Sequence, residues 1–229
     1  MANKRSVEQR NQTARAEALL ASRKKLRVFP LLSLAVTVIL LLLMLTNWAA
    51  IYNTDMSGNE IEFTGFQSVS AGLGSNYKSM DTDSFGHIST FYAFVPEKVR
   101  TLSLLSIIVL FVLVVHGLVE VFAIITNKQG AFNVLDVIFT AAATGLFVAC
   151  YAVARSMHDA MISGYCNGNP ACSVQSSAII PVILALFSLA SPILALVLDA
   201  QGKRAIREAQ ESAERAPQRK GKIKIGKRK

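Results

Sequence analysis

The stretch LLSLAVTVILLLLMLTNWAAIY, residues 31–52, contains no charged side chain, and neither does SAIIPVILALFSLASPILALVL, residues 177–198. About 20 apolar residues in a helix cross the ~30 Å hydrocarbon core of a bilayer. That core offers no water to the backbone N–H and C=O groups, so a crossing segment has to be helical. Each of the two stretches therefore predicts a membrane-spanning helix.

Two further apolar segments lie between these stretches, so the sequence predicts four spans. A soluble bundle with buried helices is the alternative, but helices on the surface of a soluble protein keep a polar face, and these long runs have none. We therefore expect an all-α membrane protein, a four-transmembrane-helix bundle of the multi-pass, tetraspan type. The predicted spans are residues 28–52, 101–126, 133–155 and 177–198, joined by loops at 53–100, 127–132 and 156–176, with terminal segments at 1–27 and 199–229.

The net charge of +9 is concentrated at the two ends of the chain. Segment 1–27 has eight Lys and Arg residues against two acidic residues, and segment 199–229 has eleven Lys and Arg residues. The 53–100 loop has six acidic residues against three basic ones. Because basic flanking segments stay on the inner side of a membrane, we expect both termini in the cytoplasm and the loops 53–100 and 156–176 outside a cell (plasma) membrane.

The tail RKGKIKIGKRK, residues 219–229, has two interpretations. Clustered Lys and Arg side chains bind phosphates, so the tail could be an arm for nucleic acid or lipid. The other interpretation is that it fixes the topology and rests on the anionic inner leaflet. No aromatic side chain is interleaved for stacking on bases, so we expect the lipid bilayer with its anionic inner leaflet as a partner, and no nucleic acid.

The 53–100 loop contains two segments with the pattern of strands. EIEFTGFQSVS, residues 60–70, alternates apolar and polar residues, and HISTFYAFV, residues 87–95, is rich in β-branched and aromatic residues. The intervening residues are of the types that form turns. Two alternatives are open: a small antiparallel sheet that forms an extracytoplasmic cap, or a loop without regular structure.

Two of the three cysteines lie together in the 156–176 loop. Cys166 and Cys172, in YCNGNPAC, flank a turn-forming sequence, and in an oxidising compartment they are expected to form a disulfide. Catalytic thiol–disulfide chemistry is the alternative, but the spacing is wider than Cys-x-x-Cys and no second outer pair is present. Cys150 lies within the third span and is expected to be a small buried apolar residue.

Titratable side chains interrupt the second and third spans. His116 and Glu120, in VVHGLVEVF at residues 114–122, are four residues apart and so lie on one face of a helix. Exposing a charge to lipid there costs at least ~2.5–3.5 kcal/mol, so this face should turn into the bundle. Asp136, near the start of the third span, could approach Glu120 across the short 127–132 loop.

Three interpretations of His116, Glu120 and Asp136 are open. They could form a path for protons or cations, contact a polar residue of a partner subunit, or hold helices together by hydrogen bonds. We predict no metal site, because the other two histidines, His87 and His158, lie in the outer loops.

Small residues recur along the third span. Ala141, Gly145 and Ala149 are spaced by four and predict a helix-packing stripe that lets another helix approach closely. In the fourth span, Pro181 and Pro192 are expected to bend the helix, with Ser188 and Ser191 available to satisfy freed carbonyl groups.

A long first outer loop with strand-like segments, a very short inner loop and a shorter second outer loop together form a layout that is similar to the claudin-type tetraspan plan. Trp48 near the first span and Arg100 at the start of the second are loosely similar to landmarks of that family. The Gly-Leu-Trp and paired-cysteine signature of its first outer loop is absent, so the resemblance concerns architecture.

These features predict a non-enzymatic integral membrane protein, a structural or accessory subunit that engages a protein partner or another copy of itself through its outer loops or cytoplasmic tails. The alternative is a small transporter or channel component that handles protons or cations through His116 and Glu120. No phosphate-binding glycine loop, Ser/His/Asp set or metal-ligand spacing is present, so we expect no enzyme activity and no cofactor.

Overall fold

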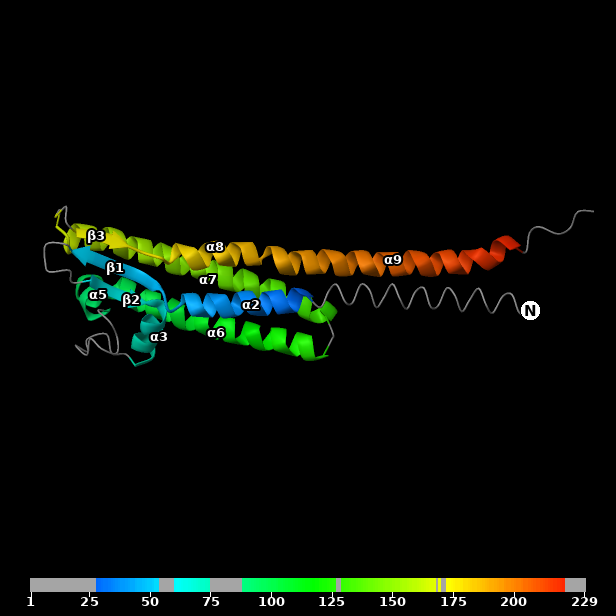
Figure 1. Ribbon diagram of the computed structural model, residues 1–229, viewed down its shortest axis with the longest axis horizontal. Helices are drawn as coiled ribbons and strands as arrows, with labels where there is room; N and C mark the ends of the chain where they lie inside the picture. Colours follow the sequence, from blue (N-terminus) through cyan, green and yellow to red (C-terminus); the bar gives the residue numbers. More distant parts are fainter. Residues whose placement is uncertain are drawn as a thin grey trace, which may run out of the picture.

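A computed structural model describes residues 28–53, 60–74, 88–126, 129–167, 169 and 172–220. The basic N-terminal segment 1–27, the tail residues 221–229 and much of the 53–100 loop lie outside the described residues. The helices are α2 (Val28–Leu43), α3 (Gly65–Gly74), α5 (Ile88–Phe94), α6 (Pro96–Thr126), α7 (Gln129–Gly164), α8 (Ile179–Ser188) and α9 (Ala190–Lys220), and the strands are β1 (Asn47–Asn53), β2 (Glu60–Thr64) and β3 (Cys172–Gln175). Figure 1 shows the long helices running side by side, with the strands, α3 and α5 gathered towards one end.

Three helical segments are long and apolar enough to cross a membrane: Pro96–Thr126, Phe132–Gly164 and Ile179–Arg204. Large apolar side chains such as Phe111, Phe122 and Phe187 are exposed on these helices, as expected for surfaces that face lipid. The second of the predicted spans begins earlier than expected because Pro96 suits the first turn of a helix, and Glu97 complements the positive helix N-terminus. The chain is therefore mostly helical, with three helices that could span a membrane.

The first predicted span, residues 28–52, is not a continuous helix. Helix α2 ends at Leu43 after 16 residues, and after a turn the chain continues as strand β1 from Asn47. Like the helix before it, strand β1 has no charged side chain, and its Trp48, Ala49 and Ala50 are all buried. Hydropathy alone cannot separate a buried strand from a buried helix, which explains the incorrect boundary.

The three strands form one antiparallel sheet in the order β2-β1-β3. Ile51 of β1 lies opposite Ile61 of β2 and Val174 of β3. The sheet therefore joins strands from both predicted outer loops around β1. Sequence analysis anticipated neither β1 nor β3, and the strand predicted over 60–70 is correct only for Glu60–Thr64.

Helix α3 begins where strand β2 ends, because the side chains of Thr64 and Gln67 cap the start of the helix reciprocally. The Thr64 backbone N–H donates to Gln67 Oε1 at 2.8 Å, and the Gln67 N–H donates to Thr64 Oγ1 at 3.1 Å. This pair is a capping box, with the sequence Thr-x-x-Gln. The second predicted strand, over residues 87–95, was also wrong, because Ile88–Phe94 forms helix α5.

The core lies between α2, α6 and α7 and extends to the sheet. Trp48 packs edge-to-face on Phe147 of α7, with ring centroids 6.3 Å apart. Met44, Leu113 and Phe147 are almost completely buried. These apolar side chains lie between the sheet end of the bundle and the part of the bundle nearer the α6–α7 turn.

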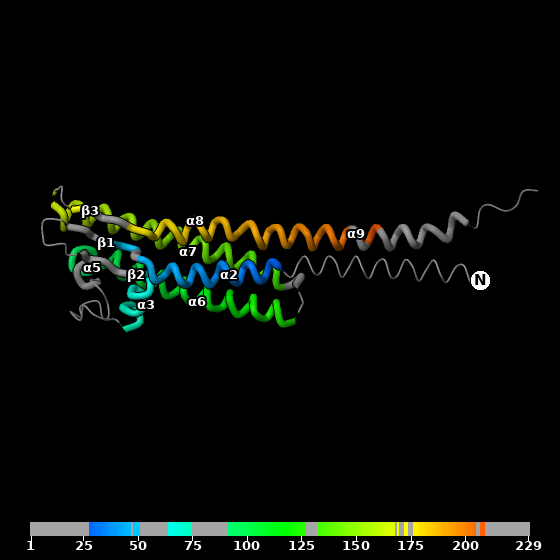
Figure 2. The backbone as a smooth tube through the Cα atoms, in the orientation of Figure 1, coloured from blue at the N-terminus to red at the C-terminus, as the bar shows by residue number. Residues whose placement is uncertain are grey.

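The fourth predicted span is interrupted between α8 and α9 at Leu189. Pro192 has no N–H for the carbonyl of Ser188, so the helix loosens here, as the sequence predicted. The carbonyl of Ala185, about one turn earlier, accepts from two hydroxyl groups, Ser188 Oγ at 2.7 Å and Thr144 Oγ1 of α7 at 3.1 Å. Beyond this break, α9 continues past the ends of α2, α6 and α7 (Figure 2).

The predicted stripe of small residues on α7 does not bring another helix of this chain close. Ala141 and Gly145 are exposed, and a Cβ atom added at Gly145 would meet nothing within 4 Å among the described residues. The buried face of α7 is offset from it and includes Thr140, Ala143 and Phe147. Within this chain the expected close approach is therefore absent, and a contact of the stripe with a second chain stays a prediction.

Candidate functional site

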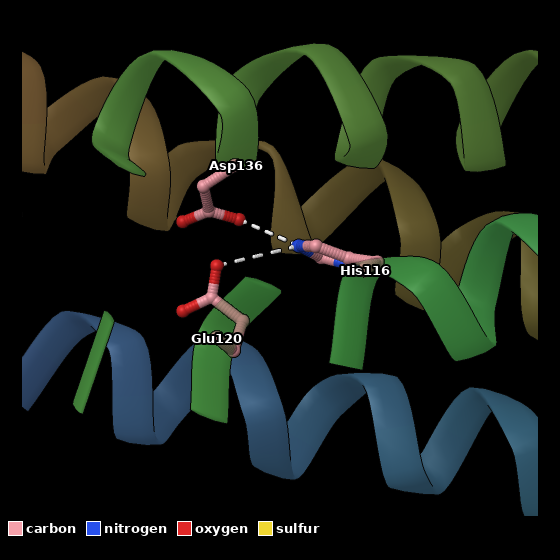
Figure 3. A group of neighbouring side chains, drawn as sticks. All are labelled: His116, Glu120 and Asp136. Carbon is pink, nitrogen blue, oxygen red and sulfur yellow. Dashed lines mark hydrogen bonds and ion pairs between the residues drawn. The ribbon is translucent and has the colours of Figure 1, made fainter. Parts of the chain in front are cut away.

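His116 and Glu120 of α6 and Asp136 of α7 meet between the helices and are called the polar cluster below (Figure 3). His116 Nε2 lies 2.8 Å from Asp136 Oδ1 and 3.6 Å from Glu120 Oε1. Their exposed fractions are 3%, 1% and 3% for His116, Glu120 and Asp136, respectively. One donor atom from each of the three side chains lies within 4.8 Å of the others.

The short connection between α6 and α7 positions the polar cluster. Helix α6 ends at Thr126 and α7 begins at Gln129, so the two helices are antiparallel neighbours. Glu120 is six residues before the end of α6, and Asp136 is seven residues after the start of α7. At 1.5 Å per residue both lie about 10 Å from the turn, so they are at the same depth. The sequence predicted an approach of Asp136 to Glu120, and the structure pairs Asp136 most closely with His116.

Helix α2 contributes two hydroxyl groups to the polar cluster. Ser33 Oγ donates to Asp136 Oδ1 at 2.8 Å, and Thr37 Oγ1 lies 3.1 Å from His116 Nδ1. Sequence analysis missed both residues. The signal was available, because Ser33 and Thr37 are the only hydroxyl-bearing residues in Val28–Leu43 and their spacing of four places them on one helix face.

The Thr37 hydroxyl fixes which nitrogen of His116 carries a proton. This hydroxyl has one proton, which it donates to the Ser33 carbonyl oxygen at 3.0 Å. Towards His116 it therefore acts as an acceptor, and Nδ1 is the donor. The other nitrogen, Nε2, is left facing the carboxylates of Asp136 and Glu120, so a proton or another cation between these acceptor atoms is needed to offset their repulsion.

Asp136 is held from several sides. Its Oδ1 atom accepts from Ser33, lies against His116 Nε2 and also accepts from Thr140 Oγ1 at 3.2 Å. Thr144 lies one turn beyond Thr140 on α7, and its hydroxyl group contacts both the Thr140 carbonyl and the Ala185 carbonyl of α8. The orientation of the Asp136 carboxylate is therefore fixed by α2, α6 and α7 together.

Glu120 is satisfied less well than Asp136. Its Oε1 atom is buried and has no hydrogen-bond partner among the described residues. An unsatisfied buried polar group costs about 1–3 kcal/mol, and more when it is charged. This oxygen faces His116 Nε2, as Figure 3 shows, so it is available to a ligand at the centre of the polar cluster.

A small cavity adjoins the polar cluster. Its volume is about 10 Å³, and its polar lining includes Ser33, Thr37, His116 and Thr140. Most of the lining is apolar, and the volume is about the minimum that holds one water molecule. Leu40, next to the cavity, and the nearby Leu113 and Phe147 are buried on the side towards the sheet. The arrangement can hold a small cation, and the apolar side chains of Leu40, Leu113 and Phe147 lie between it and the sheet end.

The predicted disulfide between Cys166 and Cys172 is present, with a Cα–Cα distance of 5.6 Å. It connects the end of α7 to strand β3. Asn167 within this turn has a φ of 45°, a left-handed conformation that Asn tolerates better than most residues. Cys150 is a buried free thiol, as the sequence predicted.

Comparisons of the chain with protein-family models, with curated proteins and with solved structures give no match. The likeness to the claudin-type plan accordingly remains one of layout. The function has to be argued from the geometry of this chain.

Proposed function

We propose that the protein is a non-enzymatic, multi-pass protein of the cell membrane with four spans: α2, α6, α7, and α8 continued by the first part of α9. Helix α2 is the one of these four spans that is shorter than a typical membrane-spanning helix. Its assignment as a span is supported by Ser33 and Thr37, which bind the polar cluster. Because the polar cluster lies within α6 and α7, α2 has to lie at the same membrane depth. Its 16 residues measure about 24 Å, slightly less than the hydrocarbon core, and tilt or local thinning of the bilayer absorbs such a difference.

The sheet and the projecting part of α9 lie at opposite ends of the bundle (Figure 1), and this arrangement supports an orientation. A disulfide at β3 is favoured by an oxidising compartment, which supports an outer position of the sheet as an extracytoplasmic cap. The basic residues of α9 are then in the cytoplasm, in agreement with the distribution of charge.

The role we propose is that of a structural or accessory subunit, and the observation that carries it is the projection of α9 beyond the bundle (Figure 1). Lys203, Arg204 and Arg207 are exposed on this part of the helix. Helices that are polar on all sides usually bridge to another body or are stabilised by side-chain ion pairs. The described part of the helix has such a pair, between Lys203 and Asp199 at 2.7 Å, and the exposed Arg204 and Arg207 can face an acidic partner surface or anionic lipid.

The test is the size of the assembly in intact membranes. We would replace Lys203, Arg204 and Arg207 with glutamate, which leaves eight basic residues in the tail to maintain topology. After cross-linking and gentle solubilisation, the wild type should migrate in a complex larger than one chain, and the substituted chain should not. Arg155→Glu, at the opposite end of the bundle, is the matched control and should retain the complex. A wild-type chain that remains monomeric would contradict the proposal.

A second function is favoured by the unpartnered carboxylate oxygen of Glu120 beside His116 and Asp136. We propose that the polar cluster handles small cations, either protons or metal ions. The buried Leu40, Leu113 and Phe147 block the way to the sheet, so passage would need a rearrangement and would have the slow rate of a transporter.

Reconstitution in liposomes tests this second function. Wild-type protein should carry protons or cations faster than protein-free liposomes, and Glu120→Gln should abolish the difference. Asp159→Asn, a change at an exposed carboxylate, should leave the flux unchanged. If the wild type gives no flux, the polar cluster does not transport cations.

A further inference from the structure

We propose that His116 Nε2 and the carboxylates of Glu120 and Asp136 bind one divalent transition-metal ion. This inference rests on the second proposed function, because it names the class of cation that the polar cluster holds. It goes against the expectation from sequence that no metal site is present, since the structure brings together three ligands from two helices.

The distances between the donor atoms suit one ion. His116 Nε2 is 2.8 Å from Asp136 Oδ1 and 3.6 Å from Glu120 Oε1. Ligand atoms that each lie ~2.1 Å from a zinc ion are separated by roughly 3.0–3.4 Å, depending on the coordination angle. The two distances to His116 Nε2 bracket this range, and the Glu120 and Asp136 oxygens, which lie within 4.8 Å of each other, have to be close enough to share the ion when it binds.

One buried carboxylate oxygen of the polar cluster, Glu120 Oε1, is free to coordinate an ion. Glu120 Oε1 is buried and has no hydrogen-bond partner, and it faces the position that the ion would occupy. The adjoining cavity of about 10 Å³ leaves room for a water molecule as a further ligand. A site with three protein ligands and one water position is the open form typical of exchangeable or catalytic zinc.

The surrounding hydrogen bonds are those of a metal-binding histidine. Such a histidine donates its other ring N–H to a nearby acceptor, which fixes the ring and directs the free nitrogen to the metal. Here His116 Nδ1 faces Thr37 Oγ1, whose own proton is given to the Ser33 carbonyl. Asp136 is oriented in the same way, by Ser33 and Thr140.

The charge of the polar cluster also favours a divalent ion. Two carboxylates and a neutral imidazole carry a charge of −2, and an uncompensated charge in the low-dielectric interior is strongly unfavourable. One divalent cation brings the sum to zero. Without the ion, a proton on Nε2 reduces this charge from −2 to −1; when the ion binds, that proton leaves to solvent and a metal–nitrogen bond forms in its place.

The donor set narrows the choice of ion. Imidazole nitrogen suits zinc, iron and nickel, and carboxylate oxygen adds manganese, whereas magnesium and calcium prefer sites made of oxygen alone. We therefore use Zn²⁺ to measure affinity and Co²⁺, which has visible absorption bands, to report the ligands.

The experiment titrates the purified full-length protein in detergent with Zn²⁺. We expect one ion per chain with release of a proton, and a Co²⁺ spectrum typical of nitrogen and oxygen ligands. Glu120→Gln and Asp136→Asn should each weaken binding at least tenfold. Thr37→Val, which keeps all three ligands and removes the acceptor of His116 Nδ1, should weaken it by roughly tenfold or more.

The matched control is Asp159→Asn. Asp159 lies 3.3 Å from His158 and is exposed, so it represents an adventitious His-carboxylate pair on the same protein. Binding should be unchanged in this variant. A wild-type chain without bound Zn²⁺ or Co²⁺ at micromolar concentrations overturns the metal site, and so does equal binding by Asp136→Asn. Should the carboxylate variants fail to fold, the wild-type stoichiometry and the Thr37→Val affinity decide the question.

The outcomes separate this inference from the function on which it rests. Flux that depends on Glu120 without any Zn²⁺ binding overturns the metal site and leaves proton handling. Zn²⁺ bound in the polar cluster without any flux leaves the metal site and overturns transport.

Discussion

Trp48 is the largest fully buried side chain, and a single glycine makes room for it. A Cβ atom on Gly65 would lie 2.5 Å from Trp48 Cε2, which no real contact allows. Since the indole is enclosed by Phe147 and the sheet, it cannot move away easily. We expect Gly65→Ala to destabilise the fold by about 1–3 kcal/mol, measured as a lower melting temperature in detergent.

Gly145→Ala is the matched control for that substitution. It adds the same methyl group to a helix at a position with nothing within 4 Å, so the melting temperature should stay the same or rise slightly. Equal losses of stability in the two variants would contradict the packing described for Trp48. A loss in Gly145→Ala alone would indicate that the stripe of small residues packs against a second chain.

At the scale of residues, the sequence predicted the three members of the polar cluster but not the hydroxyl groups around them. His116, Glu120 and Asp136 were identifiable because titratable groups are rare in apolar spans. Ser33, Thr37 and Thr140 were not, because hydroxyl groups in membrane helices usually bond to their own backbone. Only the packing of α2 against α6 and α7 shows that these hydroxyl groups orient the polar cluster.

At the scale of elements, hydropathy located the long helices and failed at their ends. Strand β1 continues the charge-free run of α2, so the absence of charge does not mark the boundary at Leu43. For α3, the sequence did contain a signal, because Thr64 and Gln67 have the spacing of a capping box. Strand β3 is four residues long and exists through its pairing with β1, which no local pattern could reveal.

The disulfide holds β3 against the end of α7, and through β3 it supports the edge of the sheet. We expect the double substitution Cys166→Ser and Cys172→Ser to lower stability by about 2 kcal/mol, because the closed loop is short. Thermal unfolding with and without reductant measures this effect. Reductant should lower the melting temperature of the wild type and leave that of the double variant unchanged, and a wild type indifferent to reductant would contradict the structural role.

At the scale of the whole molecule, the topology depends on whether the number of membrane spans is even or odd. Three helices are long enough to cross the membrane by themselves, and α2 has only 16 described residues. If α2 crosses, the number of spans is even and the two termini lie on one side. If α2 stays within one leaflet, the termini lie on opposite sides. The hydrogen bonds of Ser33 and Thr37 to the polar cluster favour the crossing.

Tags at Met1 and Lys229 distinguish the two arrangements in intact cells. We expect both tags to be protected from added protease until the membrane is permeabilised, because both ends are basic and the number of spans is even. A third tag, inserted after Asp81 in the acidic 53–100 loop, should be accessible from outside and provides the positive control. Accessibility of one terminal tag alone would show an odd number of spans and remove α2 from the bilayer. Since the hydroxyl groups of α2 reach the polar cluster only inside the membrane, that result would also require a different account of His116, Glu120 and Asp136.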